Sequence, residues 1–259
     1  MKMTQVAAQL YTLRDYLKTP DEIAVTLKKV RQIGYEAVQI SGMGPIGEAE
    51  LKRMLDGEGL ICCATHENGE KILNETDWVI ERLQKLNCRY TAYPYPGGVD
   101  MSQAESVFKL AAGLDKAGKK MRKAGQVLAY HNHALELTPI EGKTALEWIF
   151  EKTGRKNLQG EIDTYWIQNG GADPVAWCKK LKKRLPLIHL KDYTVVNNNP
   201  AYAAIGQGNL NMPAIIKAAE KAGCEWFIVE QDDCYGLDPF DNLALSYAYL
   251  KGLAEPASA

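Results

Sequence analysis

Histidines and carboxylates that could hold a metal ion or move protons follow short apolar runs of this sequence. The four histidines each stand at the end of such a run or just beyond it: His66, His131, His133 and His189. Carboxylates take similar places, at Glu67, Glu136, Glu161, Asp163, Asp192, Glu230 and Asp232. Converging carboxylates are costly to bury without a cation, and Arg14 and Lys191 are the main cations near these ends. Mixed imidazole and carboxylate donors without thiolate favour Mn²⁺, Mg²⁺ or Co²⁺, with Zn²⁺ possible, so we expect one divalent metal ion.

Eight apolar runs must position these side chains. They begin near Thr4, Tyr35, Leu60, Cys88, Gln126, Leu158, Pro186 and Glu225, about 32 residues apart on average, which is the size of one βα unit. The gaps contain helical patterns, as over residues 20–33, 102–124, 174–184 and 212–222. Runs without polar alternation, such as 60–64 and 227–229, are typical of parallel strands covered on both faces. The pattern predicts an α/β protein, a (β/α)8 TIM barrel, with residues 1–259 in a single domain.

The alternative architecture is a doubly wound open sheet. Its G-x-G-x-x-G marker is absent after the first run, which continues into Gln9-Leu-Tyr-Thr-Leu-Arg14. An isolated Gly206-x-Gly208 pair follows the seventh run, where we expect it to shape a loop or to contact a ligand. In a TIM barrel the carboxyl ends of the strands form the active-site face, so the histidines and carboxylates would meet there.

Composition restricts the function classes. The chain is 46% hydrophobic and 24% charged, and its net charge of -1 gives no general attraction for nucleic acid or anionic membranes. Residues 1–10 lack a leader pattern and no long apolar window occurs, so we expect a cytoplasmic protein. The six cysteines form no C-x-x-C pair and are expected to be buried, reduced thiols. The basic group Lys179–Arg184 is expected on the solvated face and carboxyl-terminal end of a helix.

Several motifs together resemble the xylose isomerase-like TIM-barrel superfamily. They are Glu161-Ile-Asp163, Ile188-His-Leu-Lys-Asp192 and Val229-Glu230. The segments Gln9–Arg14 and Tyr130-His-Asn-His-Ala134 are similar to one branch of it, usually labelled sugar phosphate isomerase/epimerase. The resemblance covers nearly the whole chain, and it is specific for the fold and the metal site rather than for the substrate.

The resemblance implies a one-metal site with Asp163, His189 and Glu230 as three of the ligands. Epimerases of this kind take a fourth ligand, a glutamate, from strand five, where this sequence has His131. We expect Glu136 to bend back to the metal as that fourth ligand. The alternative is that His131 or His133 takes its place.

The chemistry implied by the resemblance is metal-dependent isomerisation or epimerisation of a sugar or sugar phosphate through an enediolate. Glu230 is expected to be one base and Glu136 the other, with a strand-five histidine such as His133 as the replacement for Glu136. The expected substrate contacts come from His66, His131, Lys191 and Trp166. Trp166 would lie under an apolar sugar face, or it would pack at the barrel rim.

Two other functions stay open. A lyase of the inosose dehydratase type would expel a β-hydroxyl from a keto-sugar or keto-inositol, with His131 or His133 as the acid. A catalytically silent sugar-binding barrel would take the ligand without reaction. A DNA endonuclease of the same fold is disfavoured by the net charge and by the small number of histidines.

The expected partners are therefore small molecules: a sugar, a sugar phosphate or a cyclitol, without nucleic acid and without a membrane. A homo-oligomer is compatible with aromatic residues on the predicted helices, namely Trp148, Trp177 and Tyr247, for which core packing is the alternative.

Overall fold

Short runs of valine, isoleucine, alanine and cysteine form eight parallel strands that close into a barrel, as a computed structural model describes for residues 1–254. The strands are β1 (Val6–Gln9), β2 (Ala37–Ile40), β3 (Ile61–His66), β4 (Tyr90–Tyr93), β5 (Val127–His131), β8 (Leu158–Asp163), β9 (Leu187–Leu190) and β12 (Trp226–Val229). Consecutive barrel strands are neighbours throughout, and β12 closes against β1. Every strand begins within two residues of its predicted start, which confirms the (β/α)8 barrel. Residues 255–259 of the predicted domain lie outside the described residues.

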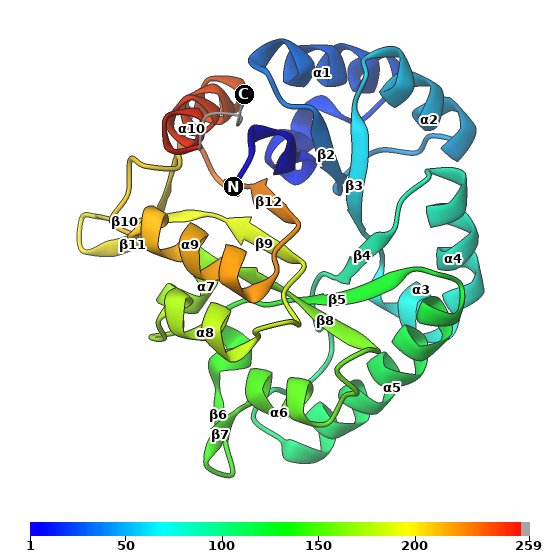
Figure 1. Cartoon of the computed structure of the whole chain (residues 1–259), viewed down its shortest axis with the longest axis vertical. Helices are drawn as coiled ribbons and strands as arrows, with labels where there is room; N and C mark the ends of the chain where they lie inside the picture. The colour runs from blue at the N-terminus through cyan, green and yellow to red at the C-terminus, as the bar shows by residue number, and fades with distance from the viewer. Residues whose placement is uncertain (255–259) are drawn as a thin grey trace.

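Helices cover the outside of the barrel and link its strands (Figure 1). Between residues 1 and 254 they are α1 (Pro20–Ile33), α2 (Glu48–Gly57), α3 (Gly69–Asn74), α4 (Thr76–Lys85), α5 (Ala104–Lys123), α6 (Ala145–Glu151), α7 (Thr164–Asn169), α8 (Pro174–Lys180), α9 (Met212–Ala222) and α10 (Pro239–Leu253). Short 3₁₀ turns lie at Met3–Gln5, Leu10–Tyr16 and Leu135–Leu137. The predicted helices over 20–33 and 212–222 have the observed bounds.

Local sequence signals explain why these two bounds could be predicted. The Thr19 side chain accepts a hydrogen bond from the Glu22 N–H at 3.3 Å, and the Glu22 carboxylate accepts one from the Thr19 N–H at 3.0 Å. This capping box, with Pro20 in the first turn, starts α1. The helix α9 stops at Gly223, whose φ of 95° is in the left-handed region that favours glycine.

The barrel interior has an apolar layer with a polar layer above it. The apolar layer contains Ala7, Ala37, Ala92, Ala129, Leu187 and Ile228. Two residues beyond five of these stand Gln9, Gln39, His131, His189 and Glu230, all buried. Alternate residues of a strand face the same side of the sheet. Each of these five strands therefore points an apolar side chain into the core and, two residues later, a polar side chain into the barrel mouth.

The prediction that the basic group Lys179–Arg184 lies on the solvated end of a helix is wrong for Arg184. Helix α8 ends at Lys180, and only 3% of Arg184 is exposed. The Arg184 guanidinium donates hydrogen bonds to the carbonyl oxygens of Leu158, Phe150 and Thr153 at 2.8, 2.6 and 3.1 Å. Charge alone pointed to the surface, but backbone carbonyls at the start of β8, within α6 and just after α6 satisfy this side chain internally.

Two hairpins extend the loops after the barrel strands. The pair β6 (Pro139–Ile140) and β7 (Lys143–Thr144) follows β5, and the pair β10 (Asp192–Val196) and β11 (Asn199–Ala203) follows β9. The second pair stands beside α9 at the left edge of Figure 1. No helix between residues 1 and 254 has the length and hydropathy needed to cross a bilayer.

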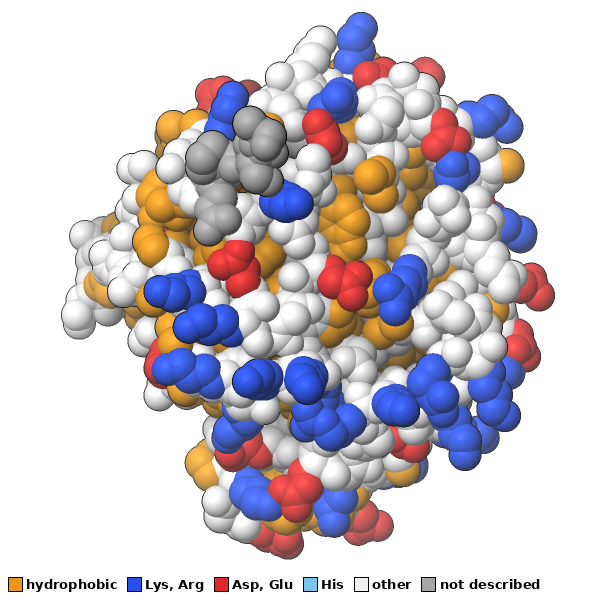
Figure 2. Space-filling view, viewed as in Figure 1, with side chains coloured by type: hydrophobic (Ala, Val, Ile, Leu, Met, Phe, Trp, Pro, Cys, Tyr) orange, Lys and Arg blue, Asp and Glu red, His pale blue; other side chains and the backbone are white. Residues whose placement is uncertain are grey.

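The aromatic residues considered for a subunit interface pack within the chain. Trp177 is buried, and Trp148 and Tyr247 pack against the core from partly buried positions. The Trp148 ring centroid lies 5.3 Å from that of Phe108, and the Tyr247 centroid lies 5.0 Å from that of Tyr35. On the face seen in Figure 2, Lys and Arg side chains gather in a band across the lower half, with most of the visible Asp and Glu above and below that band.

Candidate active site

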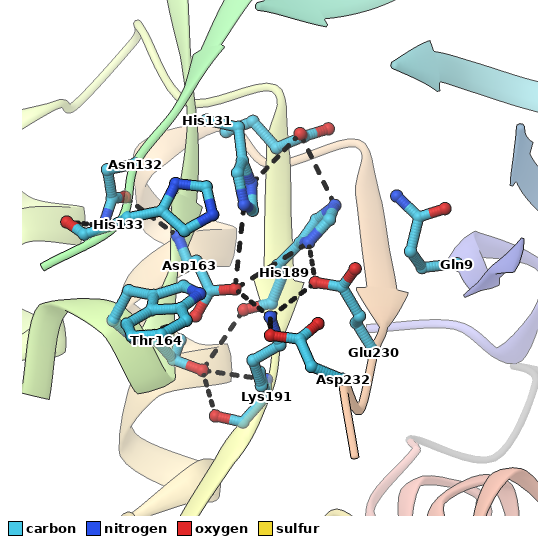
Figure 3. Close-up of polar contacts among 12 residues, drawn as sticks. Gln9, His131, Asn132, His133, Asp163, Thr164, His189, Lys191, Glu230 and Asp232 are labelled. Carbon is cyan, nitrogen blue, oxygen red and sulfur yellow. Dashed lines mark hydrogen bonds and ion pairs between the residues drawn. The ribbon is translucent and has the colours of Figure 1, made fainter. Parts of the chain in front are cut away.

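Side chains from β8, β9 and β12 converge on a buried lysine at the carboxyl end of the barrel (Figure 3). The Lys191 ammonium lies 2.8 Å from Glu230 Oε2, 3.1 Å from Asp163 Oδ2 and 2.9 Å from Asp232 Oδ2. His189 Nδ1 lies 2.9 Å from the same Glu230 oxygen. Lys191 is 1% exposed, so the barrel mouth concentrates charge where little water reaches it.

A second group of contacts, centred on Glu161, lies deeper in the barrel. Glu161 Oε2 lies 2.6 Å from His66 Nε2, and Glu161 Oε1 accepts a hydrogen bond of 2.7 Å from the Gln39 amide. Gln39 Oε1 in turn lies 2.6 Å from His189 Nε2 and accepts a 2.8 Å hydrogen bond from Gln9. These side chains, of which His66 is half-buried and the others are buried, connect five barrel strands through one polar network.

Sequence reasoning named Glu161 as a strand-end carboxylate and as part of a family motif but gave it no specific role, and it gave none to Gln9 or Gln39. A signal for the two glutamines was present, because each stands two residues after an inward-facing alanine of its strand. Glu161 stands two residues before Asp163 on the same strand, which places both carboxylates on the barrel interior. Alternation within a strand would therefore have found all three.

The donors at the barrel mouth fit a divalent metal ion. Ligand atoms of His131, Asp163, His189 and Glu230 lie within 4.8 Å of one another, and an overlapping group joins His66, His131, Glu161 and His189. His131 Nδ1 is buried without a hydrogen-bond partner. Asp163 Oδ2 is an ion-pair partner of Lys191 but accepts no hydrogen bond. A cation bound here would satisfy these two buried ligand atoms, which lack a hydrogen bond and lie next to several carboxylates.

The charges of the site call for such a cation. Glu161, Asp163 and Glu230 are each at most 4% exposed, against the single buried ammonium of Lys191. Burial lowers the pKa of His189, but Glu161 and Glu230 outweigh it and raise that pKa to about 9. Burial raises the pKa of Glu230, yet Lys191 and His189 outweigh burial and hold it well below its usual range. Protonated His189 thus supplies positive charge that a metal ion could replace.

The strand-five histidines are neutral imidazoles. Burial and the neighbouring positive groups hold the pKa of His131 well below its usual range. Burial and Lys191 lower the pKa of His133 to about 3. Neutral imidazole is the form that ligates metals and accepts protons.

A pocket of about 410 Å³ opens over this cluster. Its lining includes predicted site residues, namely His66, His131, His133, Lys191 and Glu230, together with Asp232 and Arg14. The predicted substrate contact Trp166 is half-buried, with its ring centroid 5.2 Å from that of His133 and 5.6 Å from the Lys191 ammonium. The volume suits a ligand of the size of a single sugar or cyclitol ring.

A comparison with known protein families identifies the same fold. Residues 27–252 match the family described as xylose isomerase-like TIM barrel. The chain belongs to this family. The resemblance seen in the strand-end motifs is thereby confirmed.

The names of similar proteins include two reaction classes. The rhizopine catabolism protein MocC of Rhizobium meliloti is 23% identical over 90% of this chain and 81% of its own. An inosose dehydratase of Mesomycoplasma hyopneumoniae is 24% identical over 96% of this chain and 95% of its own. A crystal structure of a sugar phosphate isomerase/epimerase from Parabacteroides distasonis superposes with a TM-score of 0.82 at 22% identity, covering 97% of this chain and 94% of the other.

Glu136 does not lie where we expected it in this xylose isomerase-like barrel. Its carboxylate accepts hydrogen bonds from the Tyr130 hydroxyl at 2.9 Å and from the His133 N–H at 2.8 Å. It belongs to neither of the two ligand groups, in which His131 takes the strand-five position. The 3₁₀ turn Leu135–Leu137 folds Glu136 back under its own loop, where it closes the loop over Tyr130. This differs from the predicted fourth ligand and favours the alternative, His131.

The buried position of Glu136 predicts a pH dependence of stability. Burial raises its pKa from 4.5 to about 7, against the opposing hydrogen bonds from His133 and Tyr130. The pKa of Glu136 is therefore higher in the folded than in the unfolded protein. The stability that the neutral Glu136 side chain contributes is complete below about pH 4.5 and is lost as the pH rises to about 7. We expect the free energy of unfolding of the wild type to fall by about 3 kcal/mol more than that of Glu136→Gln between pH 4.5 and 8, as measured by urea unfolding. Parallel pH profiles of the two proteins would contradict this.

Proposed function

We propose that this protein is a divalent-metal-dependent enzyme that removes a proton from the carbon beside the ketone of a small sugar or cyclitol. The observation that carries the proposal is that three buried carboxylates and three histidines form two overlapping groups of candidate ligands beside one pocket. Of these groups, Glu230, His66 and His131 line the pocket, as does the buried Lys191. A ligand-binding protein without catalysis has no need to bury so much uncompensated charge.

His131, Asp163, His189 and Glu230 would hold the metal ion. When bound, a divalent ion at this place polarises a ketone oxygen as a Lewis acid and so acidifies the neighbouring C–H bond. Glu230 lines the pocket and is proposed as the base that accepts the carbon-bound proton. Lys191 and His66 also line the pocket, and each offers a nitrogen that can hold substrate oxygens in place.

Two outcomes follow from the same proton removal: return of a proton, which isomerises or epimerises the substrate, or loss of a β-hydroxyl as water. Return to the opposite face needs a second base. The expected second base was Glu136, whose two carboxylate oxygens are held by Tyr130 and His133 inside the loop. Loss of water needs one base and one proton donor near the departing oxygen. We therefore place dehydration first and isomerisation or epimerisation second.

His133 is the group we propose beside the departing hydroxyl. It lines the pocket, its ring lies edge-on to Tyr95, and its buried Nδ1 has no hydrogen-bond partner in the described chain. In the elimination, Glu230 takes the proton from carbon, the C–H electron pair forms the double bond, and the C–O bond breaks. The hydroxyl leaves as water with a proton that the neutral His133 imidazole passes on from water in the pocket, and Glu230 afterwards releases the carbon-derived proton to solvent.

The names of similar proteins include both outcomes. An inosose dehydratase aligns over nearly all of this chain, and the fold is also that of a sugar phosphate isomerase/epimerase and of an L-ribulose 3-epimerase. These names point to small polyhydroxylated substrates. Isomerisation or epimerisation is therefore retained as the second candidate.

A panel of ketoses and keto-cyclitols in deuterated water, followed by NMR with Mn²⁺, Mg²⁺ or Co²⁺ present, tests the proposal. We expect a product that has lost one water. In His133→Gln we expect elimination to slow by about 100-fold while deuterium still exchanges at the carbon beside the ketone, because Glu230 is intact. Tyr95→Phe is the matched control, since it keeps the ring beside His133 and should retain wild-type elimination.

Deuterium at a retained stereocentre without loss of water would instead support the isomerase or epimerase. A ligand that binds the metal-loaded protein without any exchange of its carbon-bound protons would identify a silent sugar-binding barrel and refute the enzyme proposal.

A further inference from the structure

The loop after the seventh barrel strand, residues 191–211, contains the glycine pair that the sequence singled out. In (β/α)8 barrels the loops after strands seven and eight frequently bind a substrate phosphate through backbone N–H groups. A glycine-rich loop at this place is thus the first position to search for a phosphate site. Here the seventh strand is β9 and the loop runs through the β10–β11 hairpin to the start of α9.

The backbone N–H groups of this loop point at the protein's own Asp192. Asp192 Oδ2 accepts hydrogen bonds from Gly206 N–H at 2.9 Å and Gly208 N–H at 3.1 Å. Asp192 Oδ1 accepts from Tyr193 N–H at 2.9 Å and from Leu210 N–H at 3.2 Å. The carboxylate has no exposed surface, so the four N–H groups enclose a fixed negative charge.

The glycines are required for this enclosure. A Cβ added to Gly208 would lie 2.4 Å from Asp192 Oδ1, and one added to Gly206 would lie 2.3 Å from the Tyr249 ring. Gly206 also has a φ of 85°, in the left-handed region. The loop therefore has the backbone of an anion cradle, occupied by a carboxylate of the same chain.

The loop after the eighth strand offers no replacement. The N–H of Gln231 donates to Thr12 Oγ1 at 3.0 Å, and the N–H of Tyr235 donates to Asp233 Oδ1 at 2.7 Å. Asp232 and Asp233 add two carboxylates to the same loop. A phosphate dianion brought here would meet like charge.

The two cations of the pocket are engaged as well. Lys191 is surrounded by the carboxylates of Asp163, Glu230 and Asp232. The Arg14 guanidinium donates to the carbonyl oxygens of Tyr11 at 3.0 Å and of Asp232 at 2.8 Å. Neither side chain presents the open fork that recognises phosphate.

We infer that Asp192 makes this enzyme select a substrate without a phosphate group, because its carboxylate fills the backbone cradle in which a barrel of this kind would bind one. The inference rests on the proposed function for the reaction itself. It assigns Asp192 as a positioning and specificity-determining residue and narrows the substrate class to a ketose or keto-cyclitol without a phosphate group.

Inorganic phosphate is the probe for the cradle, used with the chelator-treated full chain so that no metal ion binds it. In the wild type we expect no saturable effect of phosphate on the thermal unfolding midpoint beyond that of sodium chloride at equal ionic strength. Asp192→Ala should unfold at a lower temperature and regain part of the loss as phosphate is added, since the anion would occupy the four free N–H groups. Asp233→Ala is the matched control: it removes a neighbouring carboxylate without opening the cradle, and phosphate should not stabilise it.

Saturable phosphate binding to the wild type, or a folded Asp192→Ala that does not respond to phosphate, would overturn the inference. Should Asp192→Ala not fold, Asp192→Ser also removes the carboxylate, leaves most of the cradle open and takes the same test, and the wild-type titration decides independently. Among substrates that react, we expect kcat/KM for the phosphorylated member of a ketose pair to be at least about 10-fold lower. The thermal-unfolding measurements with phosphate need no turnover, so they test the inference even if the proposed reaction is refuted.

Discussion

Glu230→Gln should lower turnover by about 100-fold or more while the protein still folds and binds its substrate. Glutamine keeps an oxygen that can accept hydrogen bonds from His189 and from Lys191, which now lie 2.9 and 2.8 Å from Glu230 Oε2. The amide oxygen can also still ligate the metal ion, but the variant loses the capacity to accept a proton from carbon. Steady-state rates and ligand titration of the metal-loaded variant separate the loss of chemistry from a loss of binding.

A second carboxylate of the same pocket serves as the control. Glu67 lines the pocket but is held by Arg82, with 2.9 Å between Glu67 Oε1 and the guanidinium Nε. Glu67→Gln should therefore change turnover only a few-fold. Near-normal turnover in Glu230→Gln, or an equal loss in both variants, would exclude Glu230 as the base.

The barrel could be predicted from the sequence because its signals are local and repeated. Each βα unit carries an apolar strand, and α1 and α9 also carry recognisable ends, such as Thr19 with Glu22 and Gly223. In a barrel, each strand pairs with the strands before and after it in the chain, so spacing alone indicates which segments are neighbours. The strand ends then had to meet at one face, which brought Asp163, His189 and Glu230 together.

The direction in which a loop returns could not be predicted in the same way. Glu136 follows β5 by five residues, and nothing in its spacing shows whether its carboxylate faces the metal ligands or its own loop. The outcome depends on long-range packing that positions the Tyr130 hydroxyl, and on a 3₁₀ turn that brings Glu136 onto the His133 N–H. Arg184 is a similar case, since the carbonyl groups that bind it come from distant segments.

The polar network below the site was missed for a different reason. Glutamine seldom ligates metals or transfers protons, so the residue type of Gln9 and Gln39 predicts no role in the site. Their function in the structure is to connect: Gln39 joins Glu161 to His189, and Gln9 donates to Gln39. Such a chain sets the orientation of His189 from below and explains why its two ring nitrogens face different partners.

Removal of the His189 imidazole should abolish tight metal binding, whereas removal of the Glu136 carboxylate should not. His189 belongs to both groups of candidate ligands, so either metal position loses a donor in His189→Ala. Loss of even an outer-shell partner commonly weakens metal binding 10- to 100-fold, so we expect His189→Ala to weaken it by more than about 100-fold. Glu136→Ala, whose carboxylate contacts Tyr130 and His133 instead, should hold close to one equivalent, as measured by metal analysis and calorimetric titration of the folded proteins. One tight equivalent in His189→Ala would refute the ligand set, and a metal-free Glu136→Ala would restore Glu136 as the fourth ligand in place of His131.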